Sequence, residues 1–257
     1  MMRFKSLGSG SSGNATLVQV NGSDACNVLI DCGLGLRQLG HRLDQSGVLP
    51  DQLDAIFITH EHSDHTGCVQ TLSNQYNIPV WMSMGTAAAM SFVNTSGLLH
   101  LASDGDVIEI KSLQLRPFTV PHDAREPLQL TCTNGAAKLG ILTDLGHATA
   151  HVLGQLQGCH ALMLECNHDT DLLTASAYPN FLKKRVGGQF GHLANSQAAN
   201  IAGAVLHTGL KHVVAAHLSQ QNNLPELVKN SLSEALSCST QDIIIATQDT
   251  GSPWLDA

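Results

Sequence analysis

The sequence lacks the features that mark membrane, secreted and disulfide-stabilised proteins. No apolar run reaches the roughly 18 residues of a transmembrane helix, and the amino-terminal segment MMRFKSLGSGSSGN has no apolar stretch of the kind found in signal peptides. We therefore expect a cytoplasmic protein with no membrane partner. The seven cysteines are scattered, odd in number and form no CxxC pair. This pattern excludes a disulfide scaffold or a cysteine-based zinc module and fits a reducing compartment.

Positive charge and aromatic residues are also scarce. The 13 Lys and Arg residues are outnumbered by 21 Asp and Glu, giving a formal net charge of −8. No overall basic field is therefore available to attract nucleic acid. Aromatic residues make up 4% of the chain, too few to suggest a broad base-stacking platform. The sequence also gives no indication of protein partners.

What the chain does contain is apolar residues and histidine. Hydrophobic residues account for 43% of the 257 residues and charged residues for 13%, which is typical of a globular protein with a sizeable core. No linker, low-complexity tract or repeat divides the chain, so we expect residues 1–257 to form a single domain. The 14 histidines outnumber Lys and Arg together, and histidine is the commonest metal ligand in proteins.

Hydrophobic periodicity predicts a strand-rich first half and a last third in which helices and strands alternate. We expect strands near 3–7, 15–20, 26–32, 55–59, 78–83, 106–110, 113–120, 128–134, 139–144, 160–165, 212–217 and 242–247. We expect helices near 35–45, 67–76, 85–93, 148–157, 196–208 and 224–236, the last with Asn223 as its N-cap. This order favours β-sheets packed together with helices on the outside.

The segment His60-Glu61-His62-Ser63-Asp64-His65 carries the strongest chemical signal, directly after the apolar strand AIFIT. In an extended chain His60 and His62 point the same way, and the following turn can present Asp64 and His65 nearby. Three imidazoles and a carboxylate form a site suited to Zn²⁺, Mn²⁺ or Fe²⁺. A chance match or a simple polar turn would not explain three adjacent imidazoles, so we interpret the segment as a metal site.

An HxHxDH motif after a short apolar strand resembles the signature of the metallo-β-lactamase-fold hydrolases. The resemblance extends over essentially the whole chain, because the segments VPHD, ILTD and AAHLS supply the further histidines and aspartate of that pattern. It implies a four-layer αββα sandwich of two mixed sheets flanked by helices, and a cofactor of two divalent ions, Zn²⁺ or Mn²⁺ with Fe also possible. By the resemblance, one ion takes His60, His62 and His122, and the other takes Asp64, His65 and His217, with Asp144 shared.

Two further residues have roles that the sequence leaves open. His168 could replace one of these ligands or support a ligand from behind, and we favour support. Asp31 follows the strand at 26–32 and is either a partner of a ligating histidine or a turn residue. Two divalent ions against two carboxylate ligands leave a local positive charge, which can attract an anionic substrate to an acidic protein.

Three segments distinguish between branches of this superfamily. Ser11, Ser12 and Asn14 lie in a glycine-rich loop whose polar groups can face an anion, although a plain hairpin loop has the same composition. His192 precedes an expected helix and can donate a proton to a leaving group. Glu165 ends a buried strand and can orient that histidine. The set is similar to RNase Z and the PhnP-like phosphodiesterases, in which a histidine paired with a glutamate acts on the leaving oxygen.

Six motifs together resemble the YycJ/WalJ-like group, whose members are regarded as DNA exonucleases. They lie between residues 6 and 223 and read SLGSGSSGN, LIDCG, THEHSDHTG, ECNHD, GHLAN and HLSQQNN. The resemblance implies hydrolysis of a phosphodiester by a hydroxide bridging two metal ions, with catalytic roles for Asp64, which positions or deprotonates the hydroxide, and for His192 held by Glu165. Nucleic acid or a small phosphodiester is the expected substrate.

Lys183, Lys184 and Arg185 form the only basic cluster in the sequence. They are either a solvated surface or contacts to a phosphate backbone, and their position seven residues before His192 favours the second interpretation. Two other functions remain as alternatives: hydrolysis of a thioester, lactone, lactam or small cyclic phosphodiester on the same metal centre, and a metal-free binding protein.

Overall fold

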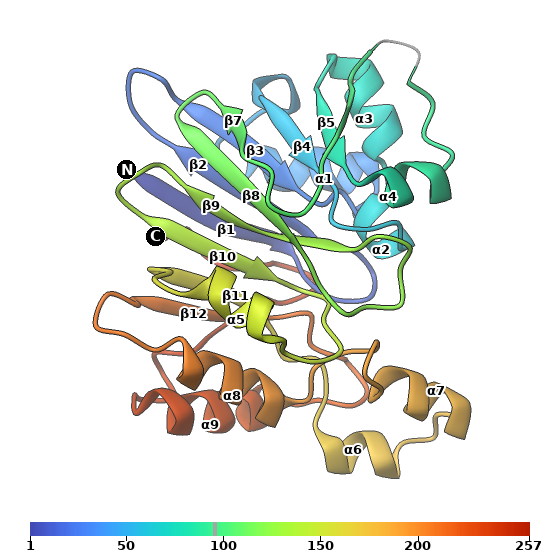
Figure 1. The fold of residues 1–257 in the computed structure, drawn as a ribbon, viewed down its shortest axis with the longest axis vertical. Helices are drawn as coiled ribbons and strands as arrows, with labels where there is room; N and C mark the ends of the chain where they lie inside the picture. The colour runs from blue at the N-terminus through green and yellow to red at the C-terminus, as the bar shows by residue number, and fades with distance from the viewer. Residues whose placement is uncertain (95–96) are drawn as a thin grey trace.

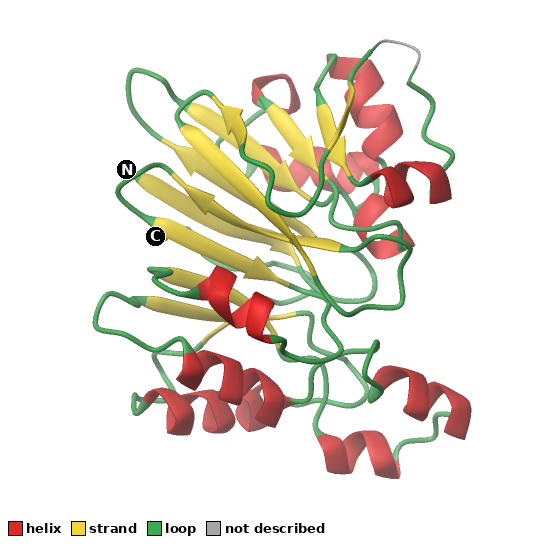
Figure 2. Ribbon diagram, in the orientation of Figure 1, coloured by secondary structure: helices red, strands yellow, loops and turns green. Residues whose placement is uncertain are grey.

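Two β-sheets packed face to face form the centre of the molecule in the computed structural model, which describes residues 1–94 and 97–257. Among the described residues each sheet has seven strands, and helices cover the outer face of each (Figures 1 and 2). The predicted sandwich of two mixed sheets between helical layers is therefore confirmed. The ends of the chain lie side by side because β14 (Leu255–Asp256) pairs with β1 (Met2–Gly8).

The first sheet combines antiparallel pairing at one side with parallel pairing at the other. Its order is β14, β1, β2 (Ala15–Val20), β3 (Cys26–Ile30), β4 (Ala55–Phe57), β5 (Val80–Met82) and β6 (Leu99–Leu101). Around it lie α1 (Leu36–Asp44), a short 3-10 helix (Pro50–Gln52), α2 (Ser63–Thr66), α3 (Val69–Tyr76) and α4 (Met84–Ala89).

The second sheet is also mixed, with parallel pairing from β10 onward. Its order is β13 (Ile244–Ile245), β12 (His212–Ala216), β11 (Ala161–Glu165), β10 (Lys138–Leu142), β9 (Leu128–Thr133), β8 (Leu113–Thr119) and β7 (Ile108–Ile110). Its outer face packs against α5 (Ala150–Leu156), α8 (Asn195–Ala204) and α9 (Pro225–Leu236).

Side chains that alternate along the strands build three apolar layers. In β4, Ala55 and Phe57 enter the core between the sheets, whereas Ile56 packs outward in the layer that contains Leu39 of α1. Strands buried on both faces need nearly continuous apolar runs, which explains segments such as AIFI and ALML. Each fully buried Leu, Ile or Phe side chain contributes roughly 1.5–3 kcal/mol to the free energy of unfolding.

The chain leaves β3, β4, β8, β10, β11 and β12 at polar segments that meet at one end of the sandwich. The pairs β3–β4, β10–β11 and β11–β12 are parallel, and β8 and β10 both run antiparallel to β9. Within each sheet these strands therefore end at a common edge. In open α/β folds the carboxyl ends of strands are the usual location of a binding site.

In the part of the chain that the structure describes, four helical segments were not predicted from the sequence. Two of them, α6 (Thr170–Ala175) and α7 (Asn180–Val186), lie beside each other at the lower right of Figure 1. The others are the 3-10 helix and α2, where the sequence predicted a turn. The short strands β6 and β14 were also missed. Within the described residues, every helix is too short or too polar to span a membrane.

Candidate metal centre and active-site cleft

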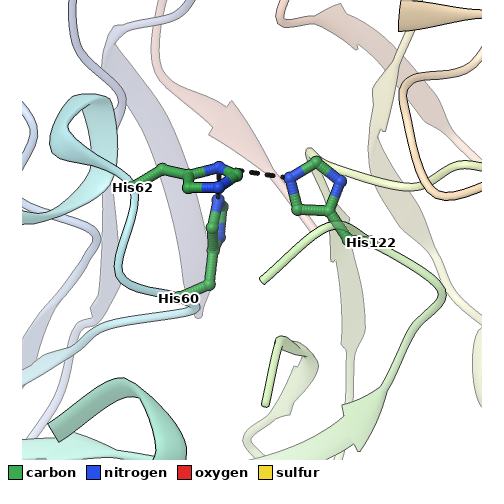
Figure 3. A group of neighbouring side chains, drawn as sticks. All are labelled: His60, His62 and His122. Atoms are coloured by element: carbon green, nitrogen blue, oxygen red, sulfur yellow. Dashed lines mark hydrogen bonds between the residues drawn. The ribbon is translucent and has the colours of Figure 1, made fainter. Parts of the chain in front are cut away.

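Three histidines from two segments turn ring nitrogens toward a common point (Figure 3). Nδ1 of His62 lies 3.0 Å from Nε2 of His60 and 3.3 Å from Nε2 of His122. His60 and His62 leave β4 in the extended backbone that the sequence predicts, and His122 follows β8. Three imidazole nitrogens at this spacing are a suitable ligand set for a divalent transition metal.

A second group forms where α2 faces the end of β12. Oδ2 of Asp64 lies 3.3 Å from Nε2 of His217 and 3.6 Å from Nε2 of His65. Asp64 and His65 belong to the first turn of α2, which begins directly after the HxH segment. His217 has a left-handed backbone with φ of 54°. Such a conformation is uncommon for a residue other than glycine, and here it turns the imidazole toward the cluster.

Asp144 lies between the two groups. Its Oδ1 is 3.8 Å from Nε2 of His122, and its Oδ2 is 3.0 Å from Nε2 of His65. The carboxylate is buried, and Oδ2 accepts no hydrogen bond within the described part of the chain. A buried oxygen so close to a ring nitrogen requires a proton or a metal cation between them. The residues therefore fit a metal site, with Asp144 placed to serve both groups.

Asp31 fixes the orientation of His65 from behind. Its Oδ2 accepts a hydrogen bond from Nδ1 of His65 at 2.8 Å, while Oδ1 accepts one from the Thr59 amide at 2.9 Å. The Thr59 hydroxyl lies 3.0 Å from both Asp31 oxygens and from Nδ1 of His60. Asp31 thus contacts a candidate ligand directly, as one of the two sequence interpretations proposed. Sequence reasoning missed Thr59, although it immediately precedes the motif.

The other histidines have similar partners behind them. Each of these contacts leaves the second ring nitrogen free, which is how metal-ligating histidines are commonly oriented. Nδ1 of His122 lies 3.0 Å from the Gly191 carbonyl, Nδ1 of His217 lies 3.3 Å from Oε1 of Glu165, and Nε2 of His62 lies 3.7 Å from Oδ1 of Asp123.

Burial and the neighbouring carboxylates shift the pKa values of these groups in opposite directions. Burial, reinforced by His65, holds the pKa of His60 well below its usual value, so its imidazole is neutral. Burial also opposes protonation of His217, but Asp144, Asp64 and Glu165 outweigh it and raise the His217 pKa to about 10. For Asp144 the burial penalty is outweighed by His217 and His65, which lower its pKa well below the usual range.

Glu165 and His192 form a hydrogen-bonded pair at the edge of this cluster. Oε1 of Glu165 accepts from Nδ1 of His192 at 2.7 Å, and Oε2 accepts from the amides of Leu145 at 2.8 Å and Leu193 at 3.2 Å. Glu165 is completely buried, whereas the His192 side chain is 23% exposed. These contacts hold the carboxylate rigidly and leave Nε2 of His192 free.

A cleft of about 370 Å³ opens over both groups. Arg185 and Asp123 form an ion pair across its wall, with Nε and Oδ2 2.6 Å apart. Sequence reasoning did not select Asp123, although its position next to His122 was an available signal. The cleft is lined by Ser11, His62, Ser63, Asp64, Asp123, Asp144, Tyr178, Leu182, Arg185, Val186, Gly191, His192 and His217.

Comparison with known proteins shows the family and the fold of this chain. The family model described as the beta-lactamase superfamily domain matches residues 26–218. The chain belongs to the metallo-β-lactamase superfamily. The exodeoxyribonuclease YycJ of Bacillus anthracis is 33% identical over 238 residues, which cover 91% of this chain and 89% of the relative. The exodeoxyribonuclease WalJ of Streptococcus pneumoniae is 29% identical, covering 91% and 88%.

A solved structure shows the same fold. The metallo-β-lactamase-fold protein YhfI of Bacillus subtilis superposes with a TM-score of 0.77 at 15% identity, covering all of both chains. The two relatives bear the names of hydrolases, and this chain has a cluster of histidines and aspartates able to bind metal.

Two of the three residues expected from the glycine-rich loop, Ser11 and Asn14, lie at the cleft or at the candidate metal ligands. Ser11 lines the cleft, whereas Ser12 is exposed and lies outside it. Asn14 is buried, and its amide nitrogen lies 3.3 Å from Oδ2 of Asp64 and 3.1 Å from Nε2 of His65. Ser9, which we did not select, accepts a hydrogen bond from the His217 amide at 2.8 Å.

The basic triplet is divided by helix geometry. Arg185 faces the cleft, whereas Lys183 and Lys184 line a different pocket on the other side of α7. His168 lines that second pocket too and belongs to none of the ligand groups within the described residues. Among the described residues no hydrogen bond joins the His168 ring to a candidate ligand, so the supporting role expected of it stays a prediction.

Proposed function

We propose that this protein is a metal-dependent phosphodiesterase that acts as a nuclease on DNA, in the manner of an exonuclease, with two divalent ions as cofactors. The observation that carries the proposal is the Glu165–His192 pair, which places a free ring nitrogen in the same cleft as the ligand groups. A proton donor there suits a reaction with a poor leaving group, such as the sugar oxygen of a phosphodiester. The names of the two similar exodeoxyribonucleases support the same substrate class.

His60, His62 and His122 would hold one ion, and Asp64, His65 and His217 the other, with Asp144 between them. When bound, divalent ions at such a site lower the pKa of a water molecule and neutralise charge on a phosphoryl group. Asp64 lines the cleft with its carboxylate partly exposed and can accept a hydrogen bond from the attacking water. The protein thus positions the nucleophile on the side of the cleft formed by α2.

His192 would act on the opposite side of the scissile bond. Burial alone would lower its pKa, but the Glu165 carboxylate outweighs burial and raises the His192 pKa above the ordinary value. The raised pKa favours the protonated imidazole, whose Nε2 proton can go to the departing oxygen. Glu165 stays ionised, because the burial penalty on its carboxyl is outweighed by His192 and the pKa is lowered.

Arg185 is a cationic residue in the wall of the cleft and is placed to bind a phosphate. Its side chain is 61% exposed, and the guanidinium is tethered to Asp123 through one nitrogen. An arginine held in this way has further N–H groups directed outward, suited to the phosphate oxygens of a strand. This local arrangement, together with the ions, would compensate for the net charge of −8.

The test is a substrate panel with the purified protein loaded with Zn²⁺ or Mn²⁺. We expect metal-dependent shortening of end-labelled DNA, abolished by EDTA, and slower cleavage of bis-p-nitrophenyl phosphate. Products are resolved at single-nucleotide steps, so that removal from one end is distinguished from internal cutting. RNA, a cyclic dinucleotide, a thioester and a lactone are measured in parallel at the same enzyme concentration.

The panel also separates the alternatives. Turnover of the thioester or lactone with inert phosphodiesters would overturn the proposal in favour of a hydrolase of carboxylic derivatives. Cleavage of only the cyclic dinucleotide would retain the chemistry but reject a nuclease. Absence of metal from the purified protein, together with no turnover after metal addition, would reject an enzyme altogether.

A further inference from the structure

Helix α7 separates two pockets that share no lining residue. Leu182, Arg185 and Val186 face the active-site cleft, whereas Asn180, Lys183, Lys184 and Gly187 line a second pocket. The second set follows the i, i+3, i+4, i+7 spacing of one helix face. This pocket has a volume of about 590 Å³ and is bounded by α6, α7 and the start of α8 (Figure 1 shows α6 and α7 side by side).

The second pocket is cationic. Its lining residues include two lysines and no carboxylate. Nζ of Lys183 donates a hydrogen bond to the Thr174 carbonyl at 2.6 Å, which fixes one lysine on the wall. Lys184 is exposed, and its side chain forms no hydrogen bond or ion pair within residues 1–94 and 97–257. The active-site cleft differs, because three aspartates line it.

His168 is an unpartnered polar side chain in the floor of this pocket. The residue is only 1% exposed, yet neither ring nitrogen has a hydrogen-bond partner among the described residues, and Nδ1 is fully enclosed. Nε2 lies 3.8 Å from the point that a Cβ on Gly187 would occupy, and Gly187 also lines the pocket. Leaving a buried polar group unpaired is unfavourable, so the ring is suited to a ligand.

The first turn of α8 forms another part of the wall. Ser196 and Gln197 line the pocket, and as residues of the first turn their amides have no acceptor within the helix. The Ser196 and Gln197 side chains, with Thr170 and Thr174, add further hydrogen-bonding groups. A helix amino terminus, two lysines and an imidazole together are the groups that bind phosphate.

We propose that the pocket formed by His168, Lys183, Lys184 and the start of α8 binds a phosphate group. The molecule that carries this phosphate, called the carrier below, is either a nucleic acid strand or a free nucleotide. A strand would be contacted away from the bond that is cut. The first carrier rests on the proposed nuclease function, whereas the phosphate site itself does not. A strand that crosses α7 from the cleft would pass Arg185 and then reach Lys184.

Binding of inorganic phosphate is measured on the full-length zinc-loaded protein with ¹⁵N-labelled histidine. His168 is identified by the signal that disappears in the His168→Gln variant. We expect phosphate to shift the His168 ring signals saturably, and Lys184→Gln to raise the required concentration about tenfold, because a charge-assisted contact is lost. Lys229→Gln, which removes one charge from α9, serves as the matched control and should leave the titration unchanged. Unfolding temperatures of all variants verify that each is folded.

Three results would overturn the site: no His168 shift at saturating phosphate, shifts confined to the histidines of the metal cluster, or an unchanged titration in Lys184→Gln. Absence of phosphodiester cleavage would defeat the proposed function but leave the His168 titration interpretable. The two failures are thus separate.

The carrier is identified with a cleavage-resistant phosphorothioate DNA oligonucleotide, whose dissociation constant is measured at several salt concentrations. If the strand occupies the pocket, Lys184→Gln should reduce the slope of log Kd against log salt by about one, whereas Lys229→Gln should not change it. An unchanged slope alongside a positive phosphate titration supports the site with a free nucleotide as its ligand.

Discussion

Oε1 of Glu165 accepts a hydrogen bond from Nδ1 of His192 at 2.7 Å and lies 3.3 Å from Nδ1 of His217. One buried carboxylate oxygen therefore orients both the candidate proton donor and a candidate metal ligand. The structure also brings Asp144, Glu165, His192 and His217 close enough to form a ligand group. Whether His192 donates a proton or binds metal is decided by separating metal content from turnover.

We expect His192→Ala to retain the metal content of the native protein and to lower kcat on DNA about 10²–10⁴-fold, the usual contribution of a general acid. Metal is measured by elemental analysis after dialysis, and turnover with end-labelled DNA. His147→Ala is the control, because that histidine is half-buried, does not line the cleft, and among the described residues its ring bonds only to the Gln189 carbonyl. A parallel loss of metal and activity in His192→Ala would instead identify His192 as a ligand.

Asp31 should act on metal affinity through His65. Asp31→Asn keeps the size of the side chain and tolerates the left-handed backbone at φ of 61°, but it removes the anionic acceptor of the His65 Nδ1 proton. Loss of such a partner typically weakens metal affinity 10–100-fold. We expect that loss in competition titrations with a zinc chelator. Asp51→Asn, at an exposed position, should bind zinc as the native chain does; equal affinity in both variants would contradict the role of Asp31.

The sequence was sufficient for the parts of the site that depend on local pattern. The HxHxDH segment combines an extended stretch with a helical turn, and both conformations follow from its position between β4 and α3. The strands with residues buried on both faces were also recognisable, because short continuous apolar runs such as ALML are typical of such strands. The superfamily resemblance then predicted which distant segments meet at this point, and in the structure His122, Asp144 and His217 lie within the ligand groups.

The sequence could not predict the features that depend on tertiary contacts. Asn223 was expected to cap the last long helix, but its side chain instead pairs with that of Asn195 at 2.9 Å, joining the starts of α8 and α9. The lysines of the basic triplet were grouped with Arg185 because they are adjacent in sequence. Only the existence of α7, a short helix with weak periodicity, shows that they face the other side.

Removal of metal should make stability depend on pH. In the folded metal-free chain the His217 pKa is raised to about 10, from an ordinary value of 6.5. A raised pKa means that the stabilisation is complete below about pH 6.5 and is lost as the pH rises toward 10. We expect the unfolding temperature of the EDTA-treated protein to fall over that interval. The zinc-loaded protein should not show this decline, because His217 is neutral when it binds metal.

The unfolding temperatures are measured by calorimetry in buffers matched for ionic strength. His217→Gln removes one titrating group and, without metal, should make the decline between pH 6.5 and 10 shallower. His65 and His192, whose pKa values are also raised, account for the decline that is left. A metal-free native protein whose stability rises with pH over this range would contradict the assignment of protonated His217 to the unloaded site.

Backbone packing behind Asp64 leads to the last prediction. A Cβ on Gly33 would lie 1.7 Å from the Asp64 carbonyl oxygen and 2.8 Å from the Asn14 amide nitrogen. Gly33→Ala must therefore displace the turn that presents Asp64 and His65. Overpacking of this kind costs about 1–3 kcal/mol. We expect lower stability together with loss of zinc from the group of Asp64, His65 and His217, measured by urea unfolding and elemental analysis.

Gly40→Ala is the matched control for this substitution, because a Cβ on Gly40, inside α1, meets no atom within 4 Å. Replacing glycine by alanine in an open helical position should stabilise the protein by about 0.5–1 kcal/mol and leave metal binding unchanged. The two substitutions add the same methyl group, so opposite signs of the stability change isolate the contact with Asp64. If Gly33→Ala binds zinc normally and unfolds as the native protein does, the position of α2 does not depend on this backbone contact, and the ligand turn tolerates more movement than its packing suggests.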